Sequence, residues 1–349
     1  MFPRTFGPLS GYFRRSALRR IIRAAAPDLI HVHAGFTSLS AVLLRELSLS
    51  FPTVGQFHDI GGFCYLGTRR FMSRDELCCR RVGIGCWRTG CYRPGDPAAM
   101  LRGAAQSLVK NDLLAKWRRL PLVVLPSSYL RDVAALQGFR PERLRVVPNS
   151  CRPQPLGSPP TEPPLILFVG ALLRTKGIHL FLDALALVAD LPWRSVVAGA
   201  GPEKARLEQQ IVDLGLTGKV SLIGPQDRPS LDKLYSECRM LVHTSTIPES
   251  FGLVGIEAMA YAKPVVGFEL GGVTEWLVNG ETGLAVTPWS PTALADGIRK
   301  LLQNPVLASQ LGLSAQARTR DRFAPERYLD RILTVYAEAV QIWRGTRSL

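Results

Sequence analysis

Short apolar runs alternate with amphipathic stretches throughout the second half of the chain. The apolar runs, which are rich in β-branched residues, predict strands at 165–169, 195–198, 220–223, 240–243 and 265–268. The stretches between them have helical spacing, so the sequence predicts an α/β domain whose parallel sheet is covered by helices on both faces. From Pro291 to about Arg344 it predicts helices only.

The first half shows the same alternation with fewer elements. Strands are predicted at 29–32, 53–57, 123–126 and 146–147, and helices at 18–25, 39–47 and 97–116. Residues 61–96 fit neither periodicity, and we expect an irregular insertion there.

A proline-rich segment divides the two halves. Residues 151–164 contain six prolines, which remove amide donors and hold each preceding residue extended. We therefore expect a linker at 151–164 between a first domain (1–150) and a second domain (165–325). A C-terminal helix is expected at 326–349.

The composition is that of a globular protein with a sizeable core, because 46% of the 349 residues are hydrophobic and 20% are charged. No apolar run approaches the roughly 20 residues that span a bilayer. The N-terminus has no apolar region of signal-peptide length. The sequence therefore predicts a cytoplasmic protein, or one on the inner face of the cell membrane.

The net charge is strongly positive, since 43 Lys and Arg residues against 28 Asp and Glu residues give +15. Such a surface favours anionic partners, including phosphorylated substrates and anionic lipid headgroups. No nucleic-acid-binding motif accompanies the charge, so we expect no nucleic-acid partner. A GC-rich genome would give the same excess of arginine, and that explanation stays open.

Residues 11–26 predict a basic amphipathic helix. Leu18, Ile21, Ile22 and Ala25 follow the spacing of one helix face, with arginines on the flanks. Such a helix suits the interface of an anionic membrane. Packing of its apolar stripe on the first domain's sheet is the alternative.

Five of the seven cysteines cluster in the insertion: Cys64, Cys78, Cys79, Cys86 and Cys91. Their spacing does not match the paired C-x-x-C pattern of a zinc site. Structural thiols and a metal or redox cluster both stay open.

Two strand-to-helix junctions in the second domain have residues suited to chemistry, since ligands of parallel sheets bind at the carboxyl ends of strands. The first junction runs from Gly170 to Gly177, where Arg174 and Lys176 supply charge for phosphate oxygens. It lacks the G-x-x-x-x-G-K-[ST] spacing of a nucleoside triphosphatase. A solvated basic turn would look similar.

The second junction follows the strand at 240–243. Glu249 lies in the loop and Glu257 on the second turn of the helix that begins near Gly252, so both carboxylates can face one crevice. The start of this helix offers amide groups for a diphosphate, from Ser250, Phe251, Gly252 and Leu253. The alternative is a helix-capping Glu249 with a solvent-facing Glu257.

These segments resemble family 4 of the retaining glycosyltransferases, whose GT-B fold has two Rossmann-like domains. The E-x7-E element from Glu249 to Glu257, within P-E-S-F-G-L-V-x-x-E-A-M-A, is that family's most specific signature. Four further motifs support it: F-V-G-x-L-x-x-x-K-G (168–177), A-G-A-G-P-E (198–203), G-G-V-x-E (271–275) and N-G-E-T-G (279–283).

The resemblance is close over residues 165 to about 325 and looser over 27–150. The looser part rests on P-D-L-I-H-V-H and the pair His58-Asp59. The resemblance implies two Rossmann-like domains with a cleft between them. It also implies transfer of a sugar from a nucleotide-diphosphate sugar to a glycan or lipid-linked acceptor, commonly in bacterial surface polysaccharide synthesis.

The resemblance also implies a role for each candidate residue. Glu249 would hold hydroxyl groups of the transferred sugar and Glu257 the ribose. Lys176, with Gly170 and Arg174 nearby, would bind the diphosphate and stabilise leaving-group charge.

His58 would project from the first domain toward the donor sugar and the acceptor. No D-x-D sequence occurs in the chain. The resemblance therefore implies a reaction without a metal, and no cofactor besides the sugar nucleotide.

Two features depart from the family pattern. Ala171 stands where many members have arginine, which makes Arg174 the candidate for the phosphate. The chain also reaches P-D-L-I-H-V-H at residue 27, about two βα units early, so we expect an incomplete N-terminal domain.

A truncated, catalytically weak nucleotide-sugar-binding protein is therefore the alternative to an active transferase. A glycoside hydrolase with Glu249 and Glu257 as its acid–base pair is disfavoured, because it leaves the phosphate-binding features unexplained.

Overall fold

The computed structural model describes residues 19–33, 41–64, 67–68, 70–71, 76–83, 86, 97–155 and 161–345. The chain separates into two compact units. The first comprises Met1–Leu125, Leu130–Val147 and Arg331–Leu349, and the second comprises Pro126–Tyr129 and Pro148–Asp330.

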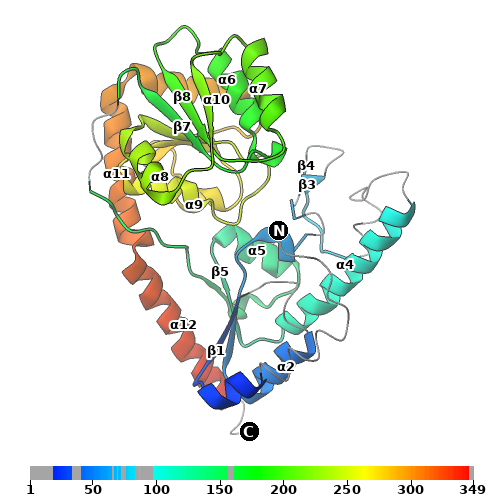
Figure 1. Cartoon of the computed structure of the whole chain (residues 1–349). Helices are drawn as coiled ribbons and strands as arrows, with labels where there is room; N and C mark the ends of the chain where they lie inside the picture. The colour runs from blue at the N-terminus through cyan, green and yellow to red at the C-terminus, as the bar shows by residue number, and fades with distance from the viewer. Residues whose placement is uncertain are drawn as a thin grey trace. The chain divides into compact units, whose positions relative to one another are not determined.

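The first unit is built on a parallel sheet with the strand order β1-β2-β5-β6 (Figure 1). These strands are β1 (Ile30–His33), β2 (Thr53–Gln56), β5 (Leu122–Leu125) and β6 (Leu144–Val146). Among the described residues of this unit, the helices are 19–25, α2 (Ala41–Ser50), α4 (Pro97–Trp117), most of α5 (Ser128–Leu136) and the C-terminal part of α12 (Pro325–Gly345), with a 3-10 turn at Pro141–Arg143. The sequence predicts these strands and helices to within a few residues, apart from α5, which it does not predict.

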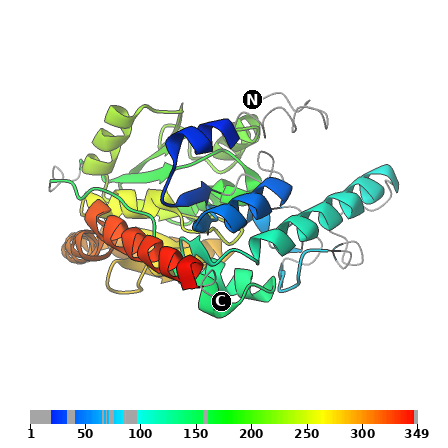
Figure 2. The same ribbon diagram turned by 90° about the horizontal axis from the view of Figure 1, so that it is seen from below.

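An aromatic cluster lies at the end of β2 in the first unit. Phe57 contacts Phe63, Trp117 and Phe139, with ring centroids 4.5, 4.7 and 5.9 Å away. Gly55 allows this packing, because a Cβ atom there would lie 2.6 Å from the Trp117 ring. Trp117 is the last residue of α4, and the rest of this helix extends beyond the sheet in both views (Figures 1 and 2).

The insertion at 61–96 contains more regular structure than expected. A 3-10 turn covers Ile60–Gly62, and β3 (Arg70–Phe71) pairs antiparallel with β4 (Glu76–Leu77). Cys78 and Cys79 are free thiols, Cys64 and Cys86 are half-buried, and Cys91 lies outside the described residues. Within the described part of the chain, no three His, Cys, Asp or Glu side chains form a group suited to a metal ion.

The second unit contains a six-stranded parallel sheet with the order β12-β11-β10-β7-β8-β9. Its strands are β7 (Leu165–Val169), β8 (Arg194–Ala198), β9 (Val220–Gly224), β10 (Met240–His243), β11 (Val265–Phe268) and β12 (Gly283–Val286). The prediction of helices only from Pro291 to about Arg344 is confirmed, but β12 is not predicted from the sequence. Between β11 and β12 the chain forms a 3-10 turn, Gly272–Glu275.

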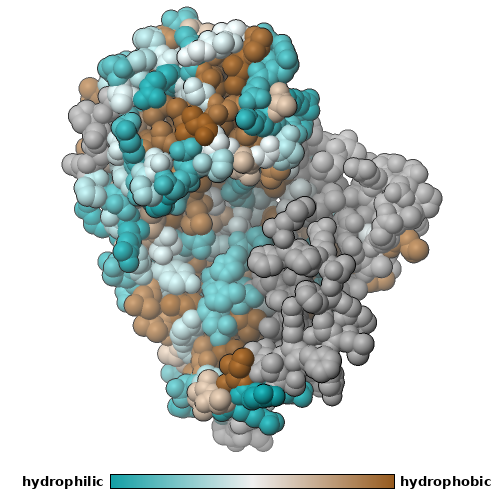
Figure 3. Space-filling view, viewed as in Figure 1, coloured by the Kyte–Doolittle hydropathy of each residue, from teal (hydrophilic) through white to brown (hydrophobic). Residues whose placement is uncertain are grey.

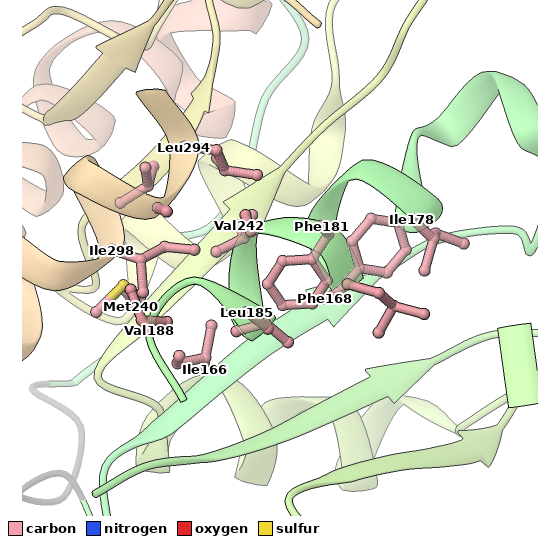
Figure 4. Close-up of a cluster of buried hydrophobic side chains, with 14 of the residues drawn as sticks. Ile166, Phe168, Ile178, Phe181, Leu185, Val188, Met240, Val242, Leu294 and Ile298 are labelled. Atoms are coloured by element: carbon pink, nitrogen blue, oxygen red, sulfur yellow. The ribbon is translucent and has the colours of Figure 1, made fainter. Parts of the chain in front are cut away.

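Alternate side chains of β7 point to opposite faces of the sheet. Ile166 and Phe168 belong to one buried cluster, and Leu165 and Leu167 belong to another. Figure 4 shows the first cluster, which includes Phe181 of α6. Burying each such side chain stabilises the fold by about 1.5–3 kcal/mol. Because both faces are covered, β7 is apolar along its whole length.

Helices on the two faces supply the rest of these clusters. Side chains of α6 (Ile178–Ala186), α7 (Lys204–Asp213) and α10 (Pro291–Gln303) enter the first. Those of α8 (Arg228–Glu237) and α9 (Leu253–Ala260) enter the second, and α11 (Pro305–Phe323) contributes to both. This arrangement confirms the predicted α/β class with two parallel-sheet domains.

The last helix, α12, covers Pro325–Gly345. The described parts of the linker, 151–155 and 161–164, contain no helix or strand. On the face of the second unit seen in Figure 3, hydrophobic side chains are interspersed with hydrophilic ones. Among the described helices, none is both long and apolar enough to cross a membrane.

Candidate functional site

The turn between β7 and α6 lies directly against the end of β10. Gly177 adopts a left-handed conformation with φ 69°, and a Cβ atom there would lie 1.9 Å from the Thr244 carbonyl oxygen. Two hydrogen bonds fix the contact: Thr244 Oγ1 donates to the Lys176 carbonyl oxygen (2.9 Å), and the Thr246 amide donates to the Thr175 carbonyl oxygen (2.8 Å). Glycine at 177 therefore lets the two strand-to-helix junctions meet.

Lys176 and Glu249 form an ion pair across this contact. Lys176 Nζ lies 2.7 Å from Glu249 Oε1, and the two side chains are 33% and 15% exposed. Both residues are predicted from the sequence as candidates for one site, and the structure brings them together.

The backbone of Glu249 is held by the G-G-V-x-E element. The Gly272 amide donates to the Glu249 carbonyl oxygen over 2.7 Å. A Cβ atom at Gly271 would lie 2.8 Å from the same oxygen. Glycine is required at this close approach, so the element fixes the loop that presents the carboxylate.

His243, the last residue of β10, is a further partner of Glu249. Its Nε2 lies 3.5 Å from Glu249 Oε1, and its side chain is 6% exposed. Burial alone would raise the pKa of Glu249, but the charges and hydrogen bonds of His243 and Lys176 outweigh it and hold that pKa far below its usual value. His243 is not among the residues predicted from the sequence, although it is the one polar residue at the end of an apolar strand.

Trp276 packs against the start of α9. The indole Nε1 donates to the Phe251 carbonyl oxygen over 2.6 Å, and a Cβ atom at Gly255 would lie 2.2 Å from the ring. Gly252 is the N-cap with φ 85°, and no side chain caps the helix. The first amides of α9, from Leu253 onward, therefore lack the side-chain acceptor that often satisfies a helix start.

Glu257 has a different set of partners from Glu249. Arg228 Nη1 donates to Oε1 over 2.8 Å, and Tyr235 OH donates to Oε2 over 2.9 Å. Burial and the neighbouring Glu257 carboxylate raise the pKa of Tyr235 well above its usual value, so the phenol stays protonated. Neither Arg228 nor Tyr235 is predicted from the sequence. Tyr235 is on the apolar face of a helix, where a tyrosine is typical of a core position.

Gly170 lies against the neighbouring A-G-A-G-P-E turn. A Cβ atom at Gly199 would lie 1.8 Å from the Gly170 carbonyl oxygen. Ala171 and Arg174 are exposed. The Arg174 charge acts on His179, whose pKa is lowered first by burial and then by that charge.

His58 lies in the first unit, where it is paired with another histidine. His33 Nδ1 and His58 Nε2 are 2.7 Å apart, and the rings are nearly parallel at 5°. Burial, followed by His33, lowers the pKa of His58. His31 Nδ1 lies 2.7 Å from Tyr336 OH, and burial with the neighbouring histidines lowers the pKa of His31 to about 4.

Two family models match the chain in succession. The model described as Glycosyltransferase Family 4 matches residues 1–154, and the model described as Glycosyl transferases group 1 matches residues 156–319. The chain therefore belongs to the family 4 glycosyltransferases and has the GT-B fold.

Curated relatives and solved structures agree with this family. The chain is 32% identical over 213 residues to D-rhamnosyltransferase WbpZ of Pseudomonas aeruginosa, covering 58% of this chain but only 55% of that protein. It is 26% identical over 323 residues to the D-inositol 3-phosphate glycosyltransferase of Paenarthrobacter aurescens, covering 90% of this chain and 73% of that protein.

A glycosyltransferase from Rickettsia africae has a similar fold, with a TM-score of 0.72 at 18% identity over 97% of this chain and 84% of that one. Alr3699/HepE of Anabaena, in complex with UDP and glucose, has a TM-score of 0.65 at 22% identity, over 99% of this chain and 84% of that one.

Proposed function

We propose that this protein is a retaining glycosyltransferase that takes a sugar from a nucleotide-diphosphate sugar and transfers it to a glycan or lipid-linked acceptor. The observation that carries the proposal is the Lys176–Glu249 pair, with Nζ 2.7 Å from Oε1, beside the uncapped start of α9. A cation and a helix N-terminus suit a diphosphate, and a neighbouring carboxylate suits sugar hydroxyl groups.

Each side chain then has a separate task. Lys176 turns from Glu249 to the diphosphate and stabilises the charge of the leaving group, and Glu249 accepts hydrogen bonds from the transferred sugar. His243 lies within 3.5 Å of the same carboxylate oxygen and keeps it paired when Lys176 moves. Glu257 accepts from the ribose.

Amides from Ser250 to Leu253 donate to the distal phosphate, and Gly170 allows the chain to pass close to the donor. Arg174 supplies further charge. In the first unit, His58 contacts the donor sugar and the acceptor.

We further propose that the reaction needs no divalent metal. Lys176 and the α9 amides already supply positive charge for the diphosphate, which is the task a metal performs in other transferases. Turnover of the sugar nucleotide with and without EDTA tests this, and a loss of turnover that magnesium or manganese restores would contradict it.

The donor class has support from similar proteins. A structure of similar fold was solved with UDP-glucose, and a relative is described as a D-rhamnosyltransferase. Bacterial surface polysaccharide synthesis, in the cytoplasm, is the setting that we propose.

We also propose peripheral binding to an anionic membrane surface. Residues 19–25 are helical and Ile21 is 63% exposed, although residues 11–18 of the predicted amphipathic helix lie outside the described residues. Each cation near the membrane contributes about 1 kcal/mol. Co-sedimentation should be strong with anionic vesicles at low salt and weak with neutral ones; equal binding to both would contradict the proposal.

Thermal-shift screening against UDP, GDP and ADP tests the main proposal, because a bound ligand raises the melting temperature by mass action. One nucleotide should raise it, and the corresponding sugar nucleotide should then be consumed. The alternative, a catalytically weak binder, is favoured by Ala171. Single-turnover assays with donor in excess distinguish the two, since the alternative predicts binding without consumption.

A further inference from the structure

Tyr235 is buried, yet its hydroxyl group reaches the carboxylate of Glu257. The residue is 0% exposed, and its OH donates to Glu257 Oε2 over 2.9 Å. Its ring stacks on that of Tyr261, with centroids 5.9 Å apart. A phenylalanine would pack in the same place without burying a polar atom that needs a partner. Packing alone therefore does not explain the hydroxyl group.

The two oxygen atoms of Glu257 have partners that differ in burial. Oε2 is held by the buried Tyr235, whereas Oε1 is held by Arg228, whose side chain is 48% exposed. An ion pair to such an exposed group stabilises by only about 0–1 kcal/mol, so Arg228 can be displaced. A carboxylate has about four acceptor positions, so Glu257 can keep its bond to Tyr235 and accept two more.

We propose that Tyr235 is a positioning residue that orients Glu257 to accept hydrogen bonds from the 2′- and 3′-hydroxyl groups of the donor ribose. The site thereby selects ribonucleotides over 2′-deoxyribonucleotides. This inference rests on the proposed function, because it takes Glu257 as the ribose-binding residue.

The selection follows from the fixed orientation of the carboxylate. With Oε2 held by Tyr235, the remaining acceptor positions point in set directions, and a missing 2′-hydroxyl group leaves one of them unfilled. Without the Tyr235 hydroxyl group, the carboxylate is free to rotate toward Arg228. The 2′-hydroxyl group of the ribose then has no acceptor in a fixed position, so the preference for the ribonucleotide is lost.

Calorimetric titration of the full chain tests this with UDP, GDP and ADP, each paired with its 2′-deoxy form. Wild type should bind its preferred ribonucleotide about tenfold or more tightly than the deoxy form, the effect of one hydrogen bond to a charged group. In Tyr235→Phe this ratio should fall to within about threefold of unity. Tyr261→Phe is the matched control, because its hydroxyl group interacts with Asp232 and Arg228 and not with Glu257, and it should keep the wild-type ratio.

Two results would overturn the inference while leaving nucleotide binding intact: equal affinity of wild type for both forms, or a wild-type ratio in Tyr235→Phe. No binding of any of the three ribonucleotides would overturn the proposed function as well. If circular dichroism shows that Tyr235→Phe is unfolded, Glu257→Gln replaces it, since that side chain is 23% exposed. A wild-type ratio in that variant would equally overturn the inference.

Discussion

Lys176 and Glu249 are 73 positions apart in the sequence, and their side chains meet at 2.7 Å between Nζ and Oε1. The contact depends on Gly177, whose missing side chain lets the turn after β7 lie against Thr244. The positive and negative partners of the proposed donor site are therefore brought together by backbone packing, and each neutralises the charge of the other.

Glu249 and Glu257 should differ in what they recognise. Glu249→Gln should lower the ratio of sugar-nucleotide to nucleoside-diphosphate affinity about tenfold, because its oxygens accept from the sugar. Glu257→Gln should weaken both ligands alike, because both contain ribose. Calorimetric titration of the two folded variants checks this, and both should lose sugar transfer. Wild-type turnover in either variant would exclude that residue from the site.

Arg174 should contribute less than Lys176 to binding of the diphosphate. Its charge acts on His179, and its side chain is exposed. Arg174→Ala should therefore weaken nucleoside-diphosphate binding by less than the roughly 1.5–3 kcal/mol expected for Lys176→Ala. If Arg174→Ala binds the diphosphate as tightly as wild type and Ala171→Arg increases turnover, the site has lost the function of the arginine that many family members have at the position of Ala171. If Arg174→Ala abolishes binding, Arg174 has replaced that arginine.

Gly177→Ala should destabilise the protein more than Gly215→Ala. At Gly177 the new Cβ atom meets the Thr244 carbonyl oxygen at 1.9 Å, whereas at Gly215, which has nearly the same φ (67° against 69°), it meets nothing within 4 Å. Backbone strain costs about 1–3 kcal/mol in either variant, and Gly177→Ala adds the clash. Urea unfolding of both variants measures the difference, and equal losses would show that the contact with Thr244 is loose.

His31 should make the protein sensitive to acid. Its pKa in the folded protein is about 4, lowered from 6.5 by burial and by His33 and His58. Between these values the unfolded chain binds the proton and the folded chain does not, so the stability that His31 contributes is complete above pH 6.5 and is lost toward pH 4. His31→Gln should lose less free energy of unfolding between pH 7 and 4.5 than wild type. Parallel losses would contradict this.

The sequence predicts the residues of the site better than their partners. Lys176 and Glu249 are predictable because both follow apolar runs, and the carboxyl ends of parallel strands meet at one edge of a sheet. Glu249 and Glu257 are predictable as a pair because their spacing is a family signature. Their partners His243 and Tyr235 depend on which side chains tertiary packing brings together, and local periodicity does not encode that.

Strand β12 is not predicted from the sequence, because it too depends on tertiary packing. β12 is only four residues long and contains a glycine and an alanine, Gly283-Leu-Ala-Val286, so its own residues favour a strand weakly. It is stabilised instead by parallel pairing with β11 along its whole length, from Val265↔Gly283 to Phe268↔Val286. A Cβ atom at Gly283 would lie 2.0 Å from the Val265 carbonyl oxygen, so this pairing needs glycine.

In the proposed function, Lys176, Glu249 and the start of α9 form the binding site of a nucleotide-diphosphate sugar. The decisive measurement for this claim is calorimetric titration of the full chain with UDP, GDP and ADP, in wild type and Lys176→Ala. We predict that wild type binds one of them and that Lys176→Ala weakens this binding by about 1.5–3 kcal/mol, roughly 10- to 150-fold in Kd. Failure of folded wild type to bind any of the three, or unchanged affinity in Lys176→Ala, would contradict the claim.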